Sequence, residues 1–374
     1  TFRVKGIPLE STHDDIESAL KNHNELRPIK QASSIFIKSL AIEAHGRSKV
    51  ATISFKIIPN KLLRGHEWTL DVVDPRNSGP RGIRQNPVLN IDDHFHGLTV
   101  LCSPPPEKHQ VDVIAISGLG GHAYGSFKER GSEHMWLSDS LPKHLTLARV
   151  IIYGYESGLA NSTGFQNLDD LGNALQKALQ ILHGRSDLER KPIIFIAHSL
   201  GGLIVKEAII QIAESNIDGV LESLRFIYGA MFFGVPNRGL DIKSFTQVVG
   251  DGPNRYLVES LGRDNSQVLD TQCRKFSKAF DFEGSSEIYC FYETRTSNTA
   301  LKDEHGKCLM TGEPTALVSK GSATHCRSWE NSNHYMCPID RDHSEMVKFS
   351  ANDIYYDTVL EILKGMSKKA AHMR

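Results

Sequence analysis

The chain has 374 residues, 40% hydrophobic and 23% charged, a length that fits about two or three domains with a large apolar core. Its 43 basic and 44 acidic side chains give a net charge of −1, far from the basic excess typical of a nucleic-acid binder. The same balance excludes an acidic disordered tail as the main body. The 6 cysteines are scattered, which favours a reducing compartment over a disulfide scaffold.

The hydropathy pattern predicts no transmembrane segment, because no apolar run approaches the roughly 18 residues that a spanning helix needs. The first residue is Thr1 and not Met, so we expect a fragment of a longer protein. We expect a cytoplasmic or organelle-associated location.

Residues 1–75 predict a small α+β module. Alternating, strand-like runs recur over residues 2–8, 35–42, 50–58 and 68–73. Ser11 and Asp14 have the spacing of a capping box, which predicts a helix after the first strand. This β-α-β-β order resembles a ferredoxin-like or RNA-recognition-motif fold. Residues 76–95 are rich in Pro and Gly and are interpreted as a linker.

An RNA-binding role for this module conflicts with its residues. Recognition of single-stranded RNA on such a sheet needs exposed aromatic side chains on which bases stack. The stacking positions fall on Arg3, Val50 and Thr52, and only Phe55 remains. We therefore expect no nucleic-acid partner and favour a structural or docking module.

Residues 96–374 alternate buried apolar strands with amphipathic helices, which predicts one α/β domain with a doubly wound, mostly parallel sheet. The expected strands cover residues 98–101, 111–117, 148–153, 193–196, 226–235 and 288–291. The expected helices cover residues 136–147 (interrupted near Pro142), 168–182, 203–213 and 354–366.

The strongest motif is Ile196-Ala197-His198-Ser199-Leu200-Gly201-Gly202, between an apolar strand and a helix. A small-x-Ser-x-small pattern at such a junction is typical of a nucleophile elbow, in which the Ser has strained backbone and its neighbours must be small. We predict Ser199 as the nucleophile, with elbow support from Ala197, His198, Gly201 and Gly202. The alternative is a helix start eased by glycine.

The loop Gly118-Leu119-Gly120-Gly121-His122 follows an earlier strand and predicts an oxyanion hole. Glycines let backbone N–H groups approach a substrate oxygen, so the Leu119 amide would pair with the amide of Leu200. The alternative is a dinucleotide-binding loop, to which Gly118-x-Gly120-x-x-Ala123 is a near match.

A nucleophile elbow of this kind is typical of the α/β-hydrolase fold, in which the catalytic triad follows the chain order Ser, acid, His. His343 is the last His before the terminal helix and is the predicted base, with His334 as its rival. Glu293 ends a strand between Ser199 and His343 and is the predicted acid. Asp342 is the alternative acid.

These motifs together resemble the fungal lipase-like serine esterase domain of the α/β-hydrolase superfamily, which is related to glycosylphosphatidylinositol inositol-deacylase and DUF676-type lipase families. The resemblance covers about residues 94–365. Ser117 and Ala197 depart from its usual His and Gly, and Asn237 replaces the usual His of a Thr-Pro-His-Arg-Gly motif. The runs that carry it are residues 111–122, 135–137, 153–155, 194–202, 232–239 and 342–349.

The resemblance implies a carboxylic ester hydrolase acting on a small-molecule or lipid ester. It allows peripheral membrane contact and fused or partner domains outside this chain. A hydrolase fold that serves as an interaction or signalling module is the alternative, with Ser117 as the sign of a weakened oxyanion loop.

Two further features lie near the predicted site. Histidine and cysteine crowd residues 305–337, but their spacing matches no common zinc pattern, so we expect neither a metal nor a cofactor. Residues 244–267 carry apolar side chains that fit either a lid over the site or ordinary packing.

Overall fold

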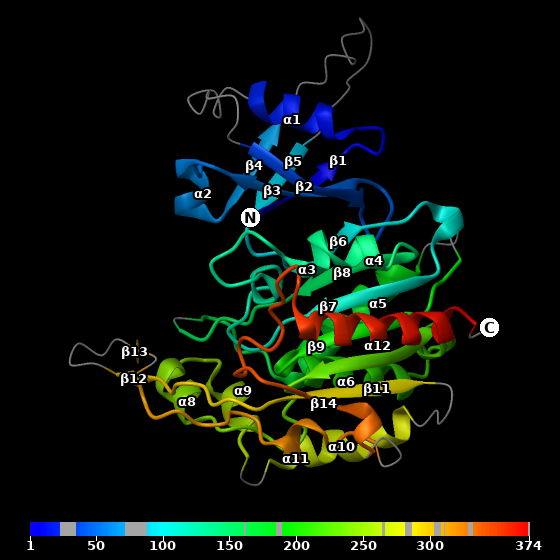
Figure 1. The fold of residues 1–374 in the computed structure, drawn as a ribbon. Coiled ribbons are helices and arrows are strands. Elements are labelled where there is room, and N and C mark those ends of the chain that lie inside the picture. The colour runs from blue at the N-terminus through cyan, green and yellow to red at the C-terminus, as the bar shows by residue number, and fades with distance from the viewer. Residues whose placement is uncertain are drawn as a thin grey trace, which may run out of the picture.

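The computed structural model describes residues 1–22, 35–71, 88–160, 162–184, 189–263, 266–280, 286–302, 308–309, 311–327 and 332–372. The N-terminal part is a sheet in the order β2-β3-β1-β5-β4, with neighbouring strands antiparallel (Figure 1). Helix α1 (His13–Asn22) and the short α2 (Asn60–Gly65) connect its strands. The strands are β1 (Phe2–Ile7), β2 (Ile35–Ile42), β3 (Lys49–Phe55), β4 (Glu67–Asp71) and β5 (Val88–Asp92).

Two expectations for this part were wrong in detail. Residues 88–92 were expected in the linker but form β5, which pairs with both β1 and β4. The Pro- and Gly-rich run before them hid the short alternation of buried positions along the strand. The capping box is one residue later than predicted, because Thr12 and Asp15 exchange the capping bonds. Residues 76–87 of the expected linker lie outside the described residues, and residues 93–95 lie between β5 and β6.

The second sheet has the order β14-β11-β10-β9-β7-β8-β6. All its pairs are parallel except β6 with β8, in agreement with the predicted mostly parallel sheet. Strands β12 (Leu301–Lys302) and β13 (Cys308–Leu309) form a separate small hairpin. The strands of the large sheet are β6 (Gly97–Cys102), β7 (Val111–Ile116), β8 (Ala148–Gly154), β9 (Ile193–His198), β10 (Ile227–Phe233), β11 (Glu287–Glu293) and β14 (Met336–Ile339).

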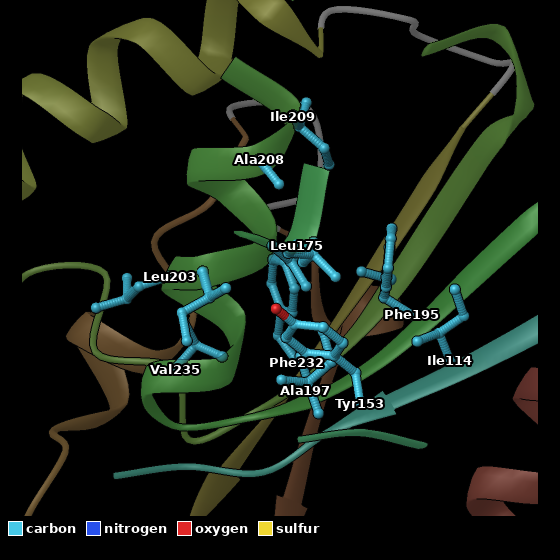
Figure 2. Close-up of a cluster of buried hydrophobic side chains, with 14 of the residues drawn as sticks. Ile114, Tyr153, Leu175, Phe195, Ala197, Leu203, Ala208, Ile209, Phe232 and Val235 are labelled. Atoms are coloured by element: carbon cyan, nitrogen blue, oxygen red, sulfur yellow. The ribbon is translucent and has the colours of Figure 1, made fainter. Parts of the chain in front are cut away.

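Helices cover both faces of the large sheet. Alternate strand residues point to opposite faces, so Phe195 and Phe232 pack with α5 and α6 (Figure 2). Ile196 and Phe233 pack with α3 and α12 on the other face. No helix of the described residues is long and apolar enough to cross a membrane. The helices are α3 (Trp136–Asp139), α4 (Leu141–His144), α5 (Leu168–His183), α6 (Leu200–Ala213), α7 (Asp218–Leu221), α8 (Lys243–Val249), α9 (Arg255–Ser260), α10 (Gln267–Ala279), α11 (Lys320–Ala323) and α12 (Ile354–Ala371).

The N-terminal sheet packs one face against β6 of the large sheet. Val50 belongs to the same apolar cluster as Val100 of β6. The stacking positions of an RNA-recognition motif are therefore covered, with Arg3, Val50 and Thr52 only 3%, 1% and 0% exposed. A base could therefore not stack at these three positions.

Arg3 bonds the two sheets at the centre of this junction. It forms a two-pronged ion pair with Asp92, at 2.9 and 3.0 Å, and both side chains are buried. Its remaining terminal nitrogen donates to His96 O at 2.8 Å and Thr99 Oγ1 at 2.9 Å, both in or beside β6.

Arg3→Met should reduce the free energy of unfolding by about 3–5 kcal/mol, because it leaves the Asp92 carboxylate buried without its cation. Chemical denaturation of the purified variant measures the change. Arg47→Met is the control, since Arg47 is exposed, and it should change the stability by less than about 0.5 kcal/mol. A matching small change for Arg3→Met would contradict this account of the junction.

Candidate active site

Ser199 stands at the sharp turn between β9 and α6. Its backbone has φ 52° and ψ −125°, and a positive φ is uncommon for a residue with a side chain. Its N–H donates to Phe233 O at 2.9 Å, which ties the turn to the neighbouring strand β10. Such strain costs on the order of 1–3 kcal/mol and persists only where the surroundings hold it. This is the backbone conformation expected of a nucleophile elbow.

The positions around Ser199 exclude larger side chains. A Cβ on Gly201 would lie 2.6 Å from Ser117 O, and one on Gly202 would lie 2.2 Å from Val235 Cγ2. Ala197 is fully buried in β9, so its methyl group fits where the resembled family has Gly. These small residues allow α6 to start directly after Ser199, with its N-terminal amides and positive dipole end beside the hydroxyl.

The loop after β7, residues 118–122, packs against Ser199. A Cβ on Gly118 would lie 2.7 Å from Ser199 Cβ. The loop is held by its own backbone, since Gly120 N–H donates to Ser157 O at 2.7 Å and Gly121 N–H to Gly118 O at 3.0 Å. Within the described chain, the amides of Leu119 and Leu200 donate to no protein acceptor. Two backbone N–H groups are thus available beside Ser199.

Glu293 and His343 form a buried pair on neighbouring strand ends. Glu293 ends β11, His343 follows β14, and His343 Nδ1 lies 2.6 Å from Glu293 Oε2. The other carboxylate oxygen accepts the Val318 N–H at 3.2 Å. Because a carboxylate accepts, Nδ1 carries the proton and Nε2 has its lone pair free. Nε2 is buried and has no hydrogen-bond partner among the described residues.

His198 holds the backbone of the proposed base. Its Nε2 donates to His343 O at 2.8 Å, and the two rings lie 4.8 Å apart. Burial, and then the nearby His343, lowers the pKa of His198 to about 3. His198 is therefore neutral at physiological pH, so it does not oppose a positive charge that forms on His343.

The structure brings Ser199, His343 and Glu293 to one edge of the sheet. Ser199 bonds through its N–H to Phe233 O, and the next residue, Gly234, packs against the base. A Cβ on Gly234 would lie 2.8 Å from His343 Cε1, and its φ of 55° also favours glycine. Ser199 and the Glu293–His343 pair therefore both lie at the carboxyl end of β10.

Both rival residues have other contacts. His334 precedes β14, at the opposite end of the strand from His343, and its Nε2 lies 3.3 Å from the hydroxyl of Tyr289. Asp342 Oδ1 accepts the N–H groups of Ser344 and Glu345 at 2.9 and 3.0 Å. Neither side chain is bonded to the residues around Ser199.

The histidine- and cysteine-rich insertion forms no metal cluster where it is described. His325 Nε2 lies 3.0 Å from a terminal nitrogen of Arg238, and Cys326 and Cys337 are free thiols. In the described ranges, no group of three or more His, Cys, Asp or Glu residues is placed to hold a metal ion. His305 and the Cys308 side chain lie outside those ranges.

The segment 244–267 contains α8 and α9 and packs beside the oxyanion loop. Asn254 Nδ2 donates to Gly158 O at 2.9 Å and to Leu159 O at 3.1 Å. Leu159 in turn lies against the loop, 3.0 Å from where a Cβ on Gly120 would be. Asn254 of this segment is therefore connected to the loop of residues 118–122 through the turn at residues 158–159.

Sequence reasoning missed two residues that support the acid and the base. Val318 bonds to Glu293, and Ser297 Oγ accepts the His343 N–H at 3.3 Å. Both belong to the insertion between these residues, where no periodicity or motif predicts a contact. Gly234 lies in the motif run 232–239, but nothing in that run predicts its contact with His343.

Comparison with known proteins supports a hydrolase. A family described as "Putative serine esterase (DUF676)" matches residues 113–233, which include Ser199 and the oxyanion loop but neither Glu293 nor His343. The chain is 21% identical to Protein SERAC1 of Bos taurus over 54% of its own length and 34% of that protein. For Protein SERAC1 of Homo sapiens the identity is 23%, over 46% of this chain and 29% of that protein. The chain thus spans about a third of the length of these relatives.

Solved structures of lipases give low overall similarity. The mature Bacillus licheniformis lipase BlEst2 is 14% identical, with 71% of this chain and 97% of that chain covered and a TM-score of 0.42. Phospholipase PlaB from Legionella pneumophila is 12% identical, with 71% and 63% covered and a TM-score of 0.48. The fungal branch and the inositol-deacylase relation stay predictions. The strand order and the elbow give this chain an α/β-hydrolase fold, and over residues 113–233 its sequence is similar to the serine esterase family.

Proposed function

We propose that this chain is a serine hydrolase that cleaves carboxylic esters through an acyl-enzyme on Ser199. His343 is the general base, Glu293 the orienting acid, and the Leu119 and Leu200 amides form the oxyanion hole. The observation that carries the proposal is the burial and hydrogen bonding of His343. It is buried, bonded to Glu293 through Nδ1, and has an unpartnered Nε2 at the edge of the sheet where Ser199 lies.

In the first half-reaction, Ser199 Oγ attacks the ester carbonyl carbon while His343 Nε2 takes the hydroxyl proton. The carbonyl oxygen becomes an oxyanion, which the two backbone N–H groups stabilise without reorganisation. The imidazolium is stabilised by Glu293, and the neutral ring of His198 adds no repulsion. When the intermediate collapses, the alcohol leaves with the proton from Nε2.

In the second half-reaction, water takes the place of the alcohol. His343 Nε2 removes a proton from the water as its oxygen attacks the acyl carbon, and the same two amides stabilise the second oxyanion. Collapse returns the proton to Ser199 Oγ and releases the carboxylic acid. Both steps use only side chains and amides of this chain, so the proposal needs no cofactor.

The test is hydrolysis of p-nitrophenyl esters with short, medium and long acyl chains by the purified wild-type chain. Release of p-nitrophenol, with a preference among the acyl chains, is expected, and rising preference for long chains would support lipid esters. The same preparation should react with a fluorophosphonate probe. A folded protein that neither hydrolyses any of these esters nor reacts with the probe would contradict the proposal and favour the interaction module.

A further inference from the structure

The turn formed by residues 92–96 connects the N-terminal sheet with the large sheet. At its start, Asp92 is bonded to Arg3, and Asp92 Oδ1 also accepts the Phe95 N–H at 2.9 Å. Phe95 is fully buried with φ 56°, a left-handed conformation in which side chains are uncommon. A Cβ on Gly154 would lie 2.2 Å from Phe95 O, so the turn packs directly on the end of β8.

Asp93 in this turn is held by the N-terminal sheet. Its N–H donates to His66 O at 3.2 Å, and its Oδ2 lies 2.9 Å from His66 Nδ1. Asp93 directly follows β5, and His66 directly precedes the paired strand β4. The neighbouring ends of these two strands therefore fix the position of the Asp93 carbonyl oxygen.

That carbonyl oxygen contacts His122, the last residue of the oxyanion loop. His122 Nδ1 accepts the N–H groups of Tyr124 and Gly125, at 3.2 and 2.9 Å. A ring nitrogen that accepts carries no proton, so the neutral ring is protonated at Nε2. Nε2 lies 2.5 Å from Asp93 O and is the donor of that bond. The local turn therefore selects the Nε2–H tautomer of His122, which is the tautomer that can donate to Asp93 O.

Only two residues, Gly120 and Gly121, separate His122 from Leu119. Gly121 N–H bonds back to Gly118 O, and Ser157 Oγ donates to Gly121 O. At the other end, Gly118 packs against Ser199. The segment that carries the Leu119 amide is therefore one short, hydrogen-bonded loop, with Ser199 packed against one end and the His122 bond to Asp93 at the other.

We propose that His122 is a positioning residue, through which the N-terminal sheet holds the Leu119 amide at the place where the oxyanion forms. This inference rests on the proposed function. Oxyanion donors act at about 2.7–3.1 Å, and a misplacement of ~1 Å can cost about 10²-fold in rate. The small module is then part of the catalytic scaffold, in addition to its packing against β6.

The test compares His122→Asn with wild type. Asparagine can still accept the N–H groups of Tyr124 and Gly125 through Oδ1, as in an Asx turn, but it is too short to reach Asp93 O. We expect kcat on a p-nitrophenyl ester to fall about 10-fold to 100-fold, with KM and the melting temperature unchanged. The rate of phosphonylation by the fluorophosphonate probe should fall in parallel, because it needs the same oxyanion hole.

His94→Asn is the matched control. His94 lies in the same turn and is exposed; its ring stacks on His96, and its Nδ1 lies 3.7 Å from Asp93 Oδ1, whereas the bond to His122 uses the Asp93 carbonyl oxygen. It should keep the wild-type kcat. Wild-type kcat in His122→Asn, or an equal loss in His94→Asn, would overturn the inference. Failure of the proposed function would look different from failure of this inference, because in that case the wild type itself would not hydrolyse the ester.

Discussion

Replacing Ser199 with alanine is expected to lower kcat for ester hydrolysis by a factor on the order of 10⁶, because the acyl-enzyme cannot form without Oγ. Steady-state kinetics on the best p-nitrophenyl ester measures the loss. Alanine keeps the Cβ that is present in the strained turn, so the melting temperature should stay close to that of the wild type. The loss would then be one of chemistry and not of folding.

The control for this variant is Ser215→Ala, just beyond the other end of α6. Ser215 Oγ accepts the Ile217 N–H at 3.2 Å and has no contact with the site. Its kcat should equal that of the wild type. Substantial residual activity in Ser199→Ala that a second class of active-site inhibitor still blocks would contradict the assignment. It would show that another residue is the nucleophile.

Replacing Glu293 with glutamine is expected to lower kcat by about 10⁴-fold, as loss of the orienting acid does in serine proteases. Glutamine is similar in size and can occupy the same space, but it carries no charge to stabilise the imidazolium. Its amide can also donate to Nδ1, which would place the proton on Nε2 and remove the base. The measurement is kcat as a function of pH. We expect kcat to stay low at every pH, because raising the pH would not restore the lost negative charge.

Asp342→Asn tests the rival acid under identical conditions. Asp342 Oδ1 accepts two backbone N–H groups, and an asparagine Oδ1 can accept the same bonds. Activity close to that of wild type is expected. If Asp342→Asn loses the activity and Glu293→Gln keeps it, the acid has been assigned to the wrong residue.

The hydrolase sheet could be predicted from the sequence because its strands are continuous apolar runs. Every residue of β7, β9 and β10 is buried, and such runs between amphipathic helices favour a parallel sheet. The short strand β14 could not be predicted, because Pro338 interrupts it and only Ile339 is buried. Strand β5 was missed for a similar reason, since its neighbours in sequence are turn residues.

The location of the candidate site was predictable where the chemistry depends on local sequence. The elbow around Ser199 needs small residues at fixed spacing, so it is visible in the sequence. His343 and Glu293 came from chain order alone, and the structure places them in contact. The supporting contacts from Val318, Ser297 and Gly234 depend on how distant loops pack, and no local pattern encodes such packing.

The docked position of the N-terminal module was also beyond sequence reasoning. The absence of stacking aromatics argued against RNA binding, but it did not indicate what covers the sheet. The buried Arg3–Asp92 pair and the His122–Asp93 contact join residues about 90 and 30 positions apart. Single polar residues that find partners at such separations leave no periodic signal.

The role of Ser199 as the nucleophile can be tested by locating the covalent adduct of a fluorophosphonate probe. The labelled wild-type chain is digested, and mass spectrometry identifies the modified residue. We predict one adduct, on Ser199, with none in Ser199→Ala and slow formation in Glu293→Gln. An adduct on another residue of the wild type, or labelling that persists in Ser199→Ala, would contradict the claim.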